Sequence, residues 1–307
     1  MPRLSLIPAC ALVLALGSLP TYGAQRAYVA SYGNDANAGA GCLLNAPCRG
    51  FAAAHTAVDP GGEIVALDAA GYGAVTITKS VTITANPGFY AGIAAASGNA
   101  VTIATPGVEV VLRGLNINGI GATFGINLTA GSELAVENCV ITNFTTRAIH
   151  VSTPAVVNVV DSVIRSNDTG MYMAGGARVS VTGTKILNST LRAFWVHGIT
   201  AGTTTRASIT DSVVSGNLVG IQAYSENGTA NAFIRVMNVT ATNNSFGVTS
   251  ELGGGLTRVS IGNSIVTDNL EYGLLQNSTA VLESLGNNLV SGNGTNVSGT
   301  ITPLGGI

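Results

Sequence analysis

The sequence predicts an all-β protein folded as a single parallel β-helix, a solenoid in which each coil of the chain stacks on the coil before it. Three observations support this prediction: a repeat of 22 to 28 residues, short apolar runs rich in Val, Ile and Thr, and turn-forming Asn, Asp, Gly and Ser between the runs. A period of this length is typical of solenoids. β-Branched runs bounded by turn residues favour strands over helices.

The repeat is clearest between Ala135 and Asn277. Each copy carries a small marker residue, followed about ten residues later by a small residue and then an apolar one. Helical apolar stripes and the frame of leucine-rich repeats are both absent, which leaves coils of about three strands stacked at ~4.8 Å. Successive markers are 23, 22, 28, 27 and 25 residues apart. The markers are Asn138, Asp161, Gly183, Asp211, Asn238 and Asn263.

The marker column has two structural explanations, and both stay open at this point. Its amide and carboxylate side chains could form a hydrogen-bonded ladder along the solenoid axis. Alternatively, Asn, Asp and Gly could recur because they tolerate a left-handed turn. Under either explanation the recurring Asp161 and Asp211 are structural, and we do not expect them to be catalytic carboxylates.

The repeated Asn/Asp-Ser-x-Ile/Val and Asn-x-x-Gly-Ile segments resemble those of the right-handed parallel β-helix proteins of the pectate-lyase-like superfamily. The resemblance covers roughly Gly62 to the C-terminus and implies right-handed coils, roughly nine or ten at this repeat length. The superfamily includes polysaccharide lyases, glycoside hydrolases, esterases, epimerases, phage tailspikes and adhesins. The resemblance therefore implies an architecture and leaves the function open.

Residues 1–23 are expected to form a secretory signal peptide that is removed by cleavage after Gly23 or Ala24. Arg3 supplies the positive charge and Leu4–Leu19 the apolar core. The apolar run is too short and too interrupted by proline to be a membrane anchor. The mature protein is therefore expected to be secreted, periplasmic or part of the cell envelope, without membrane insertion.

Residues 24–61 are predicted to form an N-terminal loop followed by a capping helix. Cys42 and Cys48 are expected to form a disulfide in an exported protein, with two free thiols as the alternative. Arg49–Val58 is the one segment with helical spacing of apolar residues, and Pro60 and the glycines after it should end the helix. Such a helix would cover the open core and the strand edges of the first coil.

Residues 62–307 are predicted to be the β-helix itself. In Ala74–Thr84 the valines and isoleucines should point inward and the threonines outward. The third mature cysteine, Cys139, stands where other repeats have Ser or Thr, so we expect a small packed core residue. The Asn- and Gly-rich tail, Leu282–Ile307, should close the last coil and then fray.

Charge and carboxylate distribution exclude several classes of function. Only 9% of the residues are charged and the net charge is −2, so neither nucleic acid nor an anionic membrane is an expected partner. The eleven arginines and two lysines look scattered. The 15 Asp and Glu residues occur singly rather than in a calcium-binding pattern, and no metal site or cofactor is predicted.

One outward column of side chains is the most unusual feature of the repeat. After the inward apolar residue of each copy, the next side chain must point out of the coil, as must the side chain two residues further on. The only Trp and two of the three His fall in these positions, where rings and polar groups could contact an extended polysaccharide. Extra residues near 198–206 and 226–231 could form a wall beside them. The candidate ligand-binding residues are His150, Tyr172, Trp195, His197, Gln222 and Tyr224.

Catalytic residues are not identifiable from the sequence. A glycoside hydrolase needs two facing carboxylates, and a uronate lyase needs a base and usually calcium ligands. Arg147, Asp168 and Arg192, just before the outward column, are the weak candidates available. The resulting hypotheses are a secreted, non-catalytic polysaccharide-contacting protein, a polysaccharide lyase or glycoside hydrolase, and a passive envelope or adhesion module that binds protein. The oligomeric state stays undetermined.

Overall fold

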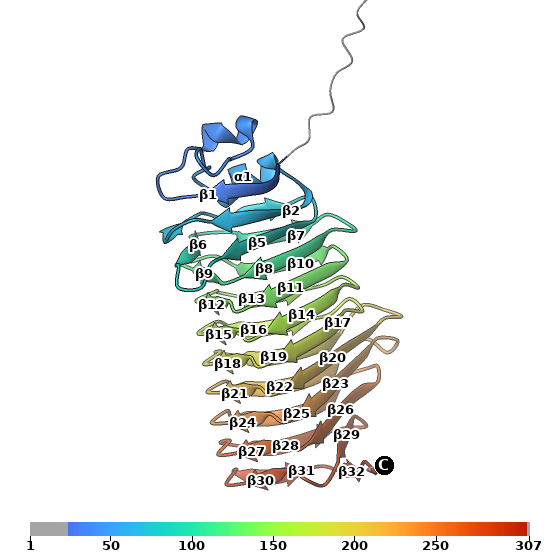
Figure 1. Ribbon diagram of the computed structural model, residues 1–307. Coiled ribbons are helices and arrows are strands. Elements are labelled where there is room, and N and C mark those ends of the chain that lie inside the picture. Colours follow the sequence, from blue (N-terminus) through green and yellow to red (C-terminus); the bar gives the residue numbers. More distant parts are fainter. Residues whose placement is uncertain (1–23, 306–307) are drawn as a thin grey trace, which may run out of the picture.

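Three parallel sheets wind around a common axis to form a right-handed β-helix of about ten coils (Figure 1). The computed structural model describes residues 24–305, so the signal peptide predicted for residues 1–23 lies outside the described residues. Every strand pairing between neighbouring coils is parallel, as the sequence predicted. None of the described helices is long and apolar enough to cross a membrane.

The first sheet contains twelve strands and is called the twelve-stranded sheet below. Its strands follow one another from coil to coil. They are β1 (Ala24–Val29), β2 (Val58–Ala66), β5 (Val81–Ala85), β8 (Glu109–Arg113), β11 (Glu133–Glu137), β14 (Val156–Val160), β17 (Arg178–Thr182), β20 (Thr204–Thr210), β23 (Asn231–Met237), β26 (Thr257–Gly262), β29 (Val281–Ser284) and β32 (Ile301–Pro303).

The second sheet, called the β3–β30 sheet, contains the strands that follow β2 to β29 of the first sheet in each coil. Its members are β3 (Ala70–Gly71), β6 (Ala91–Ala95), β9 (Leu115–Gly119), β12 (Val140–Thr142), β15 (Val163–Arg165), β18 (Lys185–Leu187), β21 (Val213–Ser215), β24 (Thr240–Thr242), β27 (Ile265–Thr267) and β30 (Leu289–Ser291).

The third sheet, called the β4–β31 sheet, completes each coil. Its members are β4 (Val75–Ile77), β7 (Asn99–Ala104), β10 (Phe124–Ala130), β13 (Arg147–Val151), β16 (Thr169–Met173), β19 (Arg192–Gly198), β22 (Val219–Ser225), β25 (Phe246–Leu252), β28 (Tyr272–Asn277) and β31 (Thr295–Ser298).

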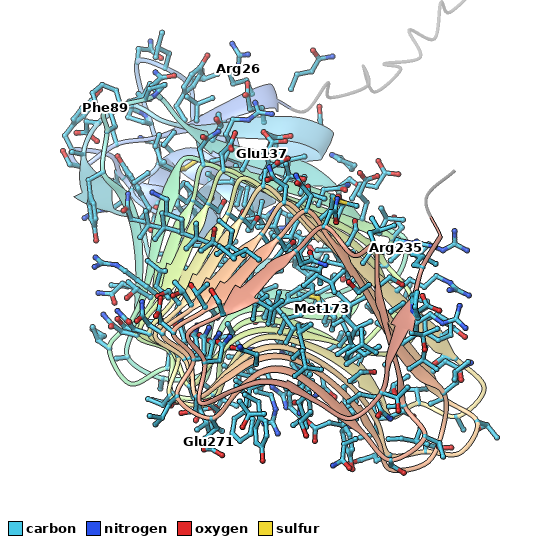
Figure 2. The ribbon with its side chains drawn as sticks, turned by 90° about the horizontal axis from the view of Figure 1, so that it is seen from below. Arg26, Phe89, Glu137, Met173, Arg235 and Glu271 are labelled. Atoms are coloured by element: carbon cyan, nitrogen blue, oxygen red, sulfur yellow. A yellow bond between two sulfur atoms is a disulfide. The ribbon has the colours of Figure 1, made fainter. Side chains whose placement is uncertain are left out.

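Apolar side chains from all three sheets fill the coil. Val75 and Ile77 are buried while Thr76 between them is exposed, which is the alternation that the sequence predicted. Met173 lies inside the coil when the solenoid is viewed along its axis (Figure 2). Cys139 is buried, as expected for a small core residue, and its thiol contacts the Leu112 carbonyl at 3.4 Å.

The marker column lies at the turn between the twelve-stranded sheet and the β3–β30 sheet. All six markers have positive φ angles, from 48° at Asn263 to 62° at Gly183. The turn explanation is therefore confirmed, because left-handed backbone favours Gly, Asn and Asp. Within the column, the Asn238 amide also donates a hydrogen bond to the Asp211 carboxylate.

A buried asparagine ladder follows a second column of left-handed residues, at the turn that leads into the β4–β31 sheet. The Asn217 amide donates to Asn244 Oδ1 at 2.8 Å, and Asn244 donates to Asn269 Oδ1 at 3.0 Å. The ladder continues to Asn293 Oδ1 at 2.8 Å. These bonds satisfy amide groups that would otherwise destabilise the interior of the turn.

The N-terminal region joins the solenoid directly. Cys42 and Cys48 form the predicted disulfide, which lies in a loop that also contains the 3-10 helix η1 (Asp35–Ala40). The predicted helix is α1 (Phe51–Ala57), which buries Phe51 in the solenoid core. The strand after it begins at Val58, before the glycines expected to separate the two elements, because Val58 and the residues that follow extend the sheet beside β1.

The C-terminal tail closes the last coil, as the sequence predicted, and the fraying expected after it stays a prediction because residues 306–307 lie outside the described residues. The tail contributes β30, β31 and β32, one strand in each sheet (Figure 1). Its asparagines are the reason: Asn293 ends the buried ladder, and Asn296 Oδ1 accepts from both the backbone and the side-chain nitrogen of Asn293. The Asn-rich composition of the tail thus continues the ladder into the last coil.

Candidate functional site

The outer face of the β4–β31 sheet carries the column that the sequence singled out. Strand pairing places its members in register on seven neighbouring strands, and a shorter second column lies beside it. The first column is Asn127, His150, Tyr172, Trp195, Gln222, Thr249 and Leu275, and the second is His197, Tyr224, Glu251 and Asn277. We call His150, Tyr172, Trp195, His197, Gln222 and Tyr224 the aromatic stripe.

The rings of the stripe contact one another from strand to strand and, for Trp195 and His197, along strand β19. His150 and Tyr172 are parallel with centroids 5.1 Å apart, and Tyr172 meets Trp195 edge-on at 4.9 Å. Trp195 stacks on His197 at 4.5 Å, and His197 on Tyr224 at 5.5 Å. The strand spacing of ~4.8 Å places such rings within the range at which aromatic pairs attract. The stripe is therefore rigid.

Two arginines at the start of their strands lie over these rings. The Arg147 guanidinium carbon is 3.7 Å from the Tyr172 ring centroid, and that of Arg192 is 4.1 Å from the Trp195 centroid. Cation–π contacts of this kind are stabilising, more so when partly desolvated. Arg147 also donates to His150 Nδ1 at 2.7 Å. Burial lowers the pKa of both arginines, and it is the largest of the effects that act on each pKa.

A polar chain extends the stripe toward the next strand. Arg192 Nε donates to Gln222 Oε1, and Gln222 Nε2 donates to Glu251 Oε1 at 2.7 Å. Glu251 thereby lies at the end of a line of side chains from β19 across β22 to β25. This line balances the Arg192 charge with a carboxylate two strands away.

A second line runs from Tyr172 through His197 to Glu226. The Tyr172 hydroxyl lies 3.1 Å from His197 Nδ1, and His197 Nε2 lies 3.5 Å from Glu226 Oε2. Burial raises the pKa of Tyr172 and lowers the pKa of His197, so the phenol is the donor to a neutral imidazole. The remaining N–H of His197 then points at Glu226, which comes from one of the predicted wall segments.

Several stripe residues are less accessible than their outward direction suggested. Tyr172 and Gln222 are each 5% exposed and His197 is 4% exposed. Adjacent rings and the guanidinium groups cover them, because side chains on neighbouring strands contact one another at the strand spacing. His150, Trp195 and Tyr224 keep partial exposure and are the parts of the stripe that a ligand can reach.

Of the three catalytic candidates, Asp168 stands apart. Its carboxylate oxygens accept from the Thr169 hydroxyl at 3.2 Å and the Thr190 hydroxyl at 3.5 Å. Among residues 24–305 no ion pair joins it to Arg147 or Arg192, although its charge opposes the lowering of both arginine pKa values. The described part of the chain also holds no group of three metal-ligating side chains.

Sequence reasoning located the columns but missed the contacts that join them to their surroundings. The Glu226 contact depends on the path of the extra residues after β22, which the repeat does not specify. The Gln222–Glu251 hydrogen bond links the two columns across adjacent strands, and could have been anticipated from the register alone.

Comparison with known proteins agrees with this architecture. A family model described as right handed beta helix region matches residues 91–257. Among solved structures, the crystal structure of pectate lyase Pel9A is similar, with a TM-score of 0.54 and 16% sequence identity over 90% of this chain and 76% of that one. At this identity the likeness is one of fold. No curated protein matches the sequence significantly.

Proposed function

Because the chain belongs to the right-handed β-helix family, we propose that it is a secreted protein that binds extended polysaccharide along the aromatic stripe. The observation that carries the proposal is the continuous stack from His150 to Tyr224, which offers partly exposed rings and polar edges on successive strands. Sugar rings pair an apolar face with hydroxyl edges, so aromatic faces and hydrogen-bonding groups side by side match them.

The rigidity of the aromatic stripe supports a role in ligand binding. Stacking and cation–π contacts fix Trp195 before any ligand arrives, so little side-chain entropy would be lost on binding. The similarity in fold to a pectate lyase is compatible with a polysaccharide ligand. The Cys42–Cys48 disulfide is compatible with the extracellular location that secretion implies.

Trp195 fluorescence tests the proposal, because it is the only tryptophan in the sequence. We expect a saturable change in emission with at least one member of a panel of neutral and acidic polysaccharides. Tyr224→Ala should weaken this binding roughly ten-fold through loss of a partly exposed ring. Tyr90→Ala removes an exposed tyrosine elsewhere and should leave binding unchanged. A panel without any response would contradict the proposal.

A second candidate function, polysaccharide lyase, is favoured by the Tyr172–His197–Glu226 line. Lyases break the glycosidic bond after a base removes the proton beside a uronate carboxylate, which leaves a double bond in the product. Glu226 is the exposed end of this line and would accept the proton, His197 would hold the Glu226 carboxylate in place, and Arg147 and Arg192 would stabilise the developing negative charge. Ultraviolet absorbance of unsaturated product, lost in Glu226→Gln, would establish this activity. Binding without any product would exclude it for the glycans tested.

A further inference from the structure

A groove of about 500 Å³ lies on the outer face of the twelve-stranded sheet, a different sheet from the one that holds the aromatic stripe. Its base is formed by β20, β23, β26 and β29, and Leu285 and Leu304 line it near the C-terminal end. A volume of this size is within the range occupied by small-ligand sites.

Arginines gather in and beside this groove, contrary to the scattered distribution read from the sequence. Arg206, Arg235 and Arg258 line it, and Arg178 lies in register with Arg206 on the adjacent strand β17. All four side chains are exposed. Arg235 points away from the coil into solvent when the solenoid is viewed along its axis (Figure 2). The clustering arises because residues about one repeat apart lie on neighbouring strands.

Most of this positive charge is not neutralised within the protein. Among residues 24–305, no ion pair or side-chain hydrogen bond engages Arg206 or Arg235. Glu283 is the one carboxylate in the groove, at 3.5 Å from Arg258 Nε, and it also accepts from Ser260. By contrast, the arginines Arg26 and Arg113 of the same sheet, nearer the N-terminus, pair with glutamates at 2.7 Å.

We propose that this groove binds an acidic oligosaccharide, with its carboxylate groups held by Arg206, Arg235 and Arg258. A guanidinium group matches a carboxylate in a two-pronged hydrogen bond. Arg206 and Arg258 lie two strands apart, about 10 Å at the normal strand spacing, so they can hold separate groups of an extended chain. Hydroxyls of Ser208 and Thr210 line the groove and match the hydroxyls of a sugar.

Phe233 favours a saccharide over a single-stranded nucleic acid. Its ring lies between the two arginines, with the Arg206 guanidinium carbon at 4.8 Å from the ring centroid and that of Arg258 at 5.9 Å. A nucleic-acid site of this kind needs several open aromatic faces on which bases stack. Here the single ring is flanked by guanidinium groups, which direct the site toward anionic groups rather than bases.

Isothermal titration calorimetry with a mannuronate hexasaccharide tests the proposal, with mannohexaose as the neutral ligand of matching linkage. We expect the acidic ligand to bind and the neutral one to bind at least roughly ten-fold more weakly, since each charged hydrogen bond is worth about that factor. Arg206→Gln and Arg258→Gln should each weaken acidic-ligand binding by roughly ten-fold. Arg206→Lys, which keeps the charge but loses the fork, should give an intermediate loss.

The controls separate this groove from the aromatic stripe. Arg165→Gln removes an exposed arginine from the β3–β30 sheet and should leave affinity unchanged. Tyr224→Ala should also leave the groove's affinity unchanged, even where it weakens the binding of another glycan that Trp195 fluorescence reports. Unaltered binding in the Arg206→Gln, Arg258→Gln double variant would overturn the proposal. So would equally tight binding of a single-stranded oligothymidylate of the same charge.

Discussion

Two outer faces of the same solenoid use their side chains in opposite ways. On the β4–β31 sheet, Tyr172 and Trp195 lie under guanidinium groups, with Tyr172 buried and Trp195 half-buried. On the C-terminal half of the twelve-stranded sheet, Arg206 and Arg235 are exposed, and among the described residues neither has an ion pair or a side-chain hydrogen bond. On the first face the arginines pack against the rings of the same face, whereas on the second most of the arginine charge has no carboxylate partner.

The difference follows from what a strand repeat of ~4.8 Å does to each kind of side chain. Rings on adjacent strands attract and bury one another, and an arginine on the same face gains by lying over a ring. Like charges on adjacent strands repel, so Arg178 and Arg206, which are in register, remain exposed. A column of side chains is thus packed and rigid when aromatic residues recur on adjacent strands, and exposed when arginines recur there.

The largest expected effect is a difference in the free energy of unfolding between variants that remove a ring from each face. Tyr172→Ala should lower the free energy of unfolding by about 3 kcal/mol, because it removes a buried ring that contacts others on both sides. Phe233→Ala, on the open face, should cost about 1 kcal/mol, because that ring is only partly buried. Denaturant unfolding of both variants measures the difference.

Tyr172→Phe isolates the hydroxyl from the ring. It keeps the stack and removes only the donor to His197 Nδ1, so it should cost about 1 kcal/mol, well below the alanine variant. Equal losses in Tyr172→Ala and Phe233→Ala would show that the enclosed and open faces do not differ in packing.

The next effect is a dependence of stability on pH that arises from the enclosed face. Burial and the nearby Arg147 lower the pKa of His150 to about 4 from its ordinary 6.5. Between these values the unfolded chain binds more protons, so stability falls as the pH falls from about 6.5 toward 4. The loss from this ring should be on the order of 1 kcal/mol, because a partly exposed group is screened by solvent. Denaturation midpoints between pH 7 and pH 4.5 measure it.

His150→Gln should flatten part of that pH profile. His55 on α1 also has its pKa lowered to about 4, mainly by burial, and contributes in the same direction. Its Nε2 accepts from the Thr78 backbone N–H at 3.0 Å, which requires the neutral ring. The double variant should show a smaller slope in this window, and the remaining slope should come from His197, whose pKa burial also lowers. An unchanged slope in it would contradict the assignment.

The architecture was predictable because it depends on local periodicity. The marker spacing gives the register from coil to coil, and alternation within a strand gives the inward and outward directions. His150, Tyr172 and Trp195 were therefore placed in one column from sequence alone, and strand pairing puts them there. The Asn ladder escaped the same reasoning, because its column also contains Phe144 and Ser189 in earlier coils and is less uniform than the markers.

What was not predictable depends on how neighbouring side chains cover one another. Outward direction does not mean exposure, as the 5% exposure of Tyr172 demonstrates. The arginine groove was overlooked for another reason. Arg178, Arg206, Arg235 and Arg258 are separated by 28, 29 and 23 residues, close to the repeat length. A test of arginine spacing against the repeat would have placed them on one face.

The smallest effect compares arginines on the two faces. Arg192→Gln should lower the free energy of unfolding by about 1 kcal/mol, through loss of its contact with Trp195 and its hydrogen bond to Gln222. Arg235→Gln should change it by less than about 0.5 kcal/mol, because an exposed arginine without a partner contributes little to the folded state. Denaturant unfolding of both variants measures the difference. Both substitutions remove one positive charge, so a general charge effect would shift the two denaturation midpoints by the same amount. A measured gap between them would show that only one of these arginines belongs to the packing of its face, and that the other is free to engage a ligand.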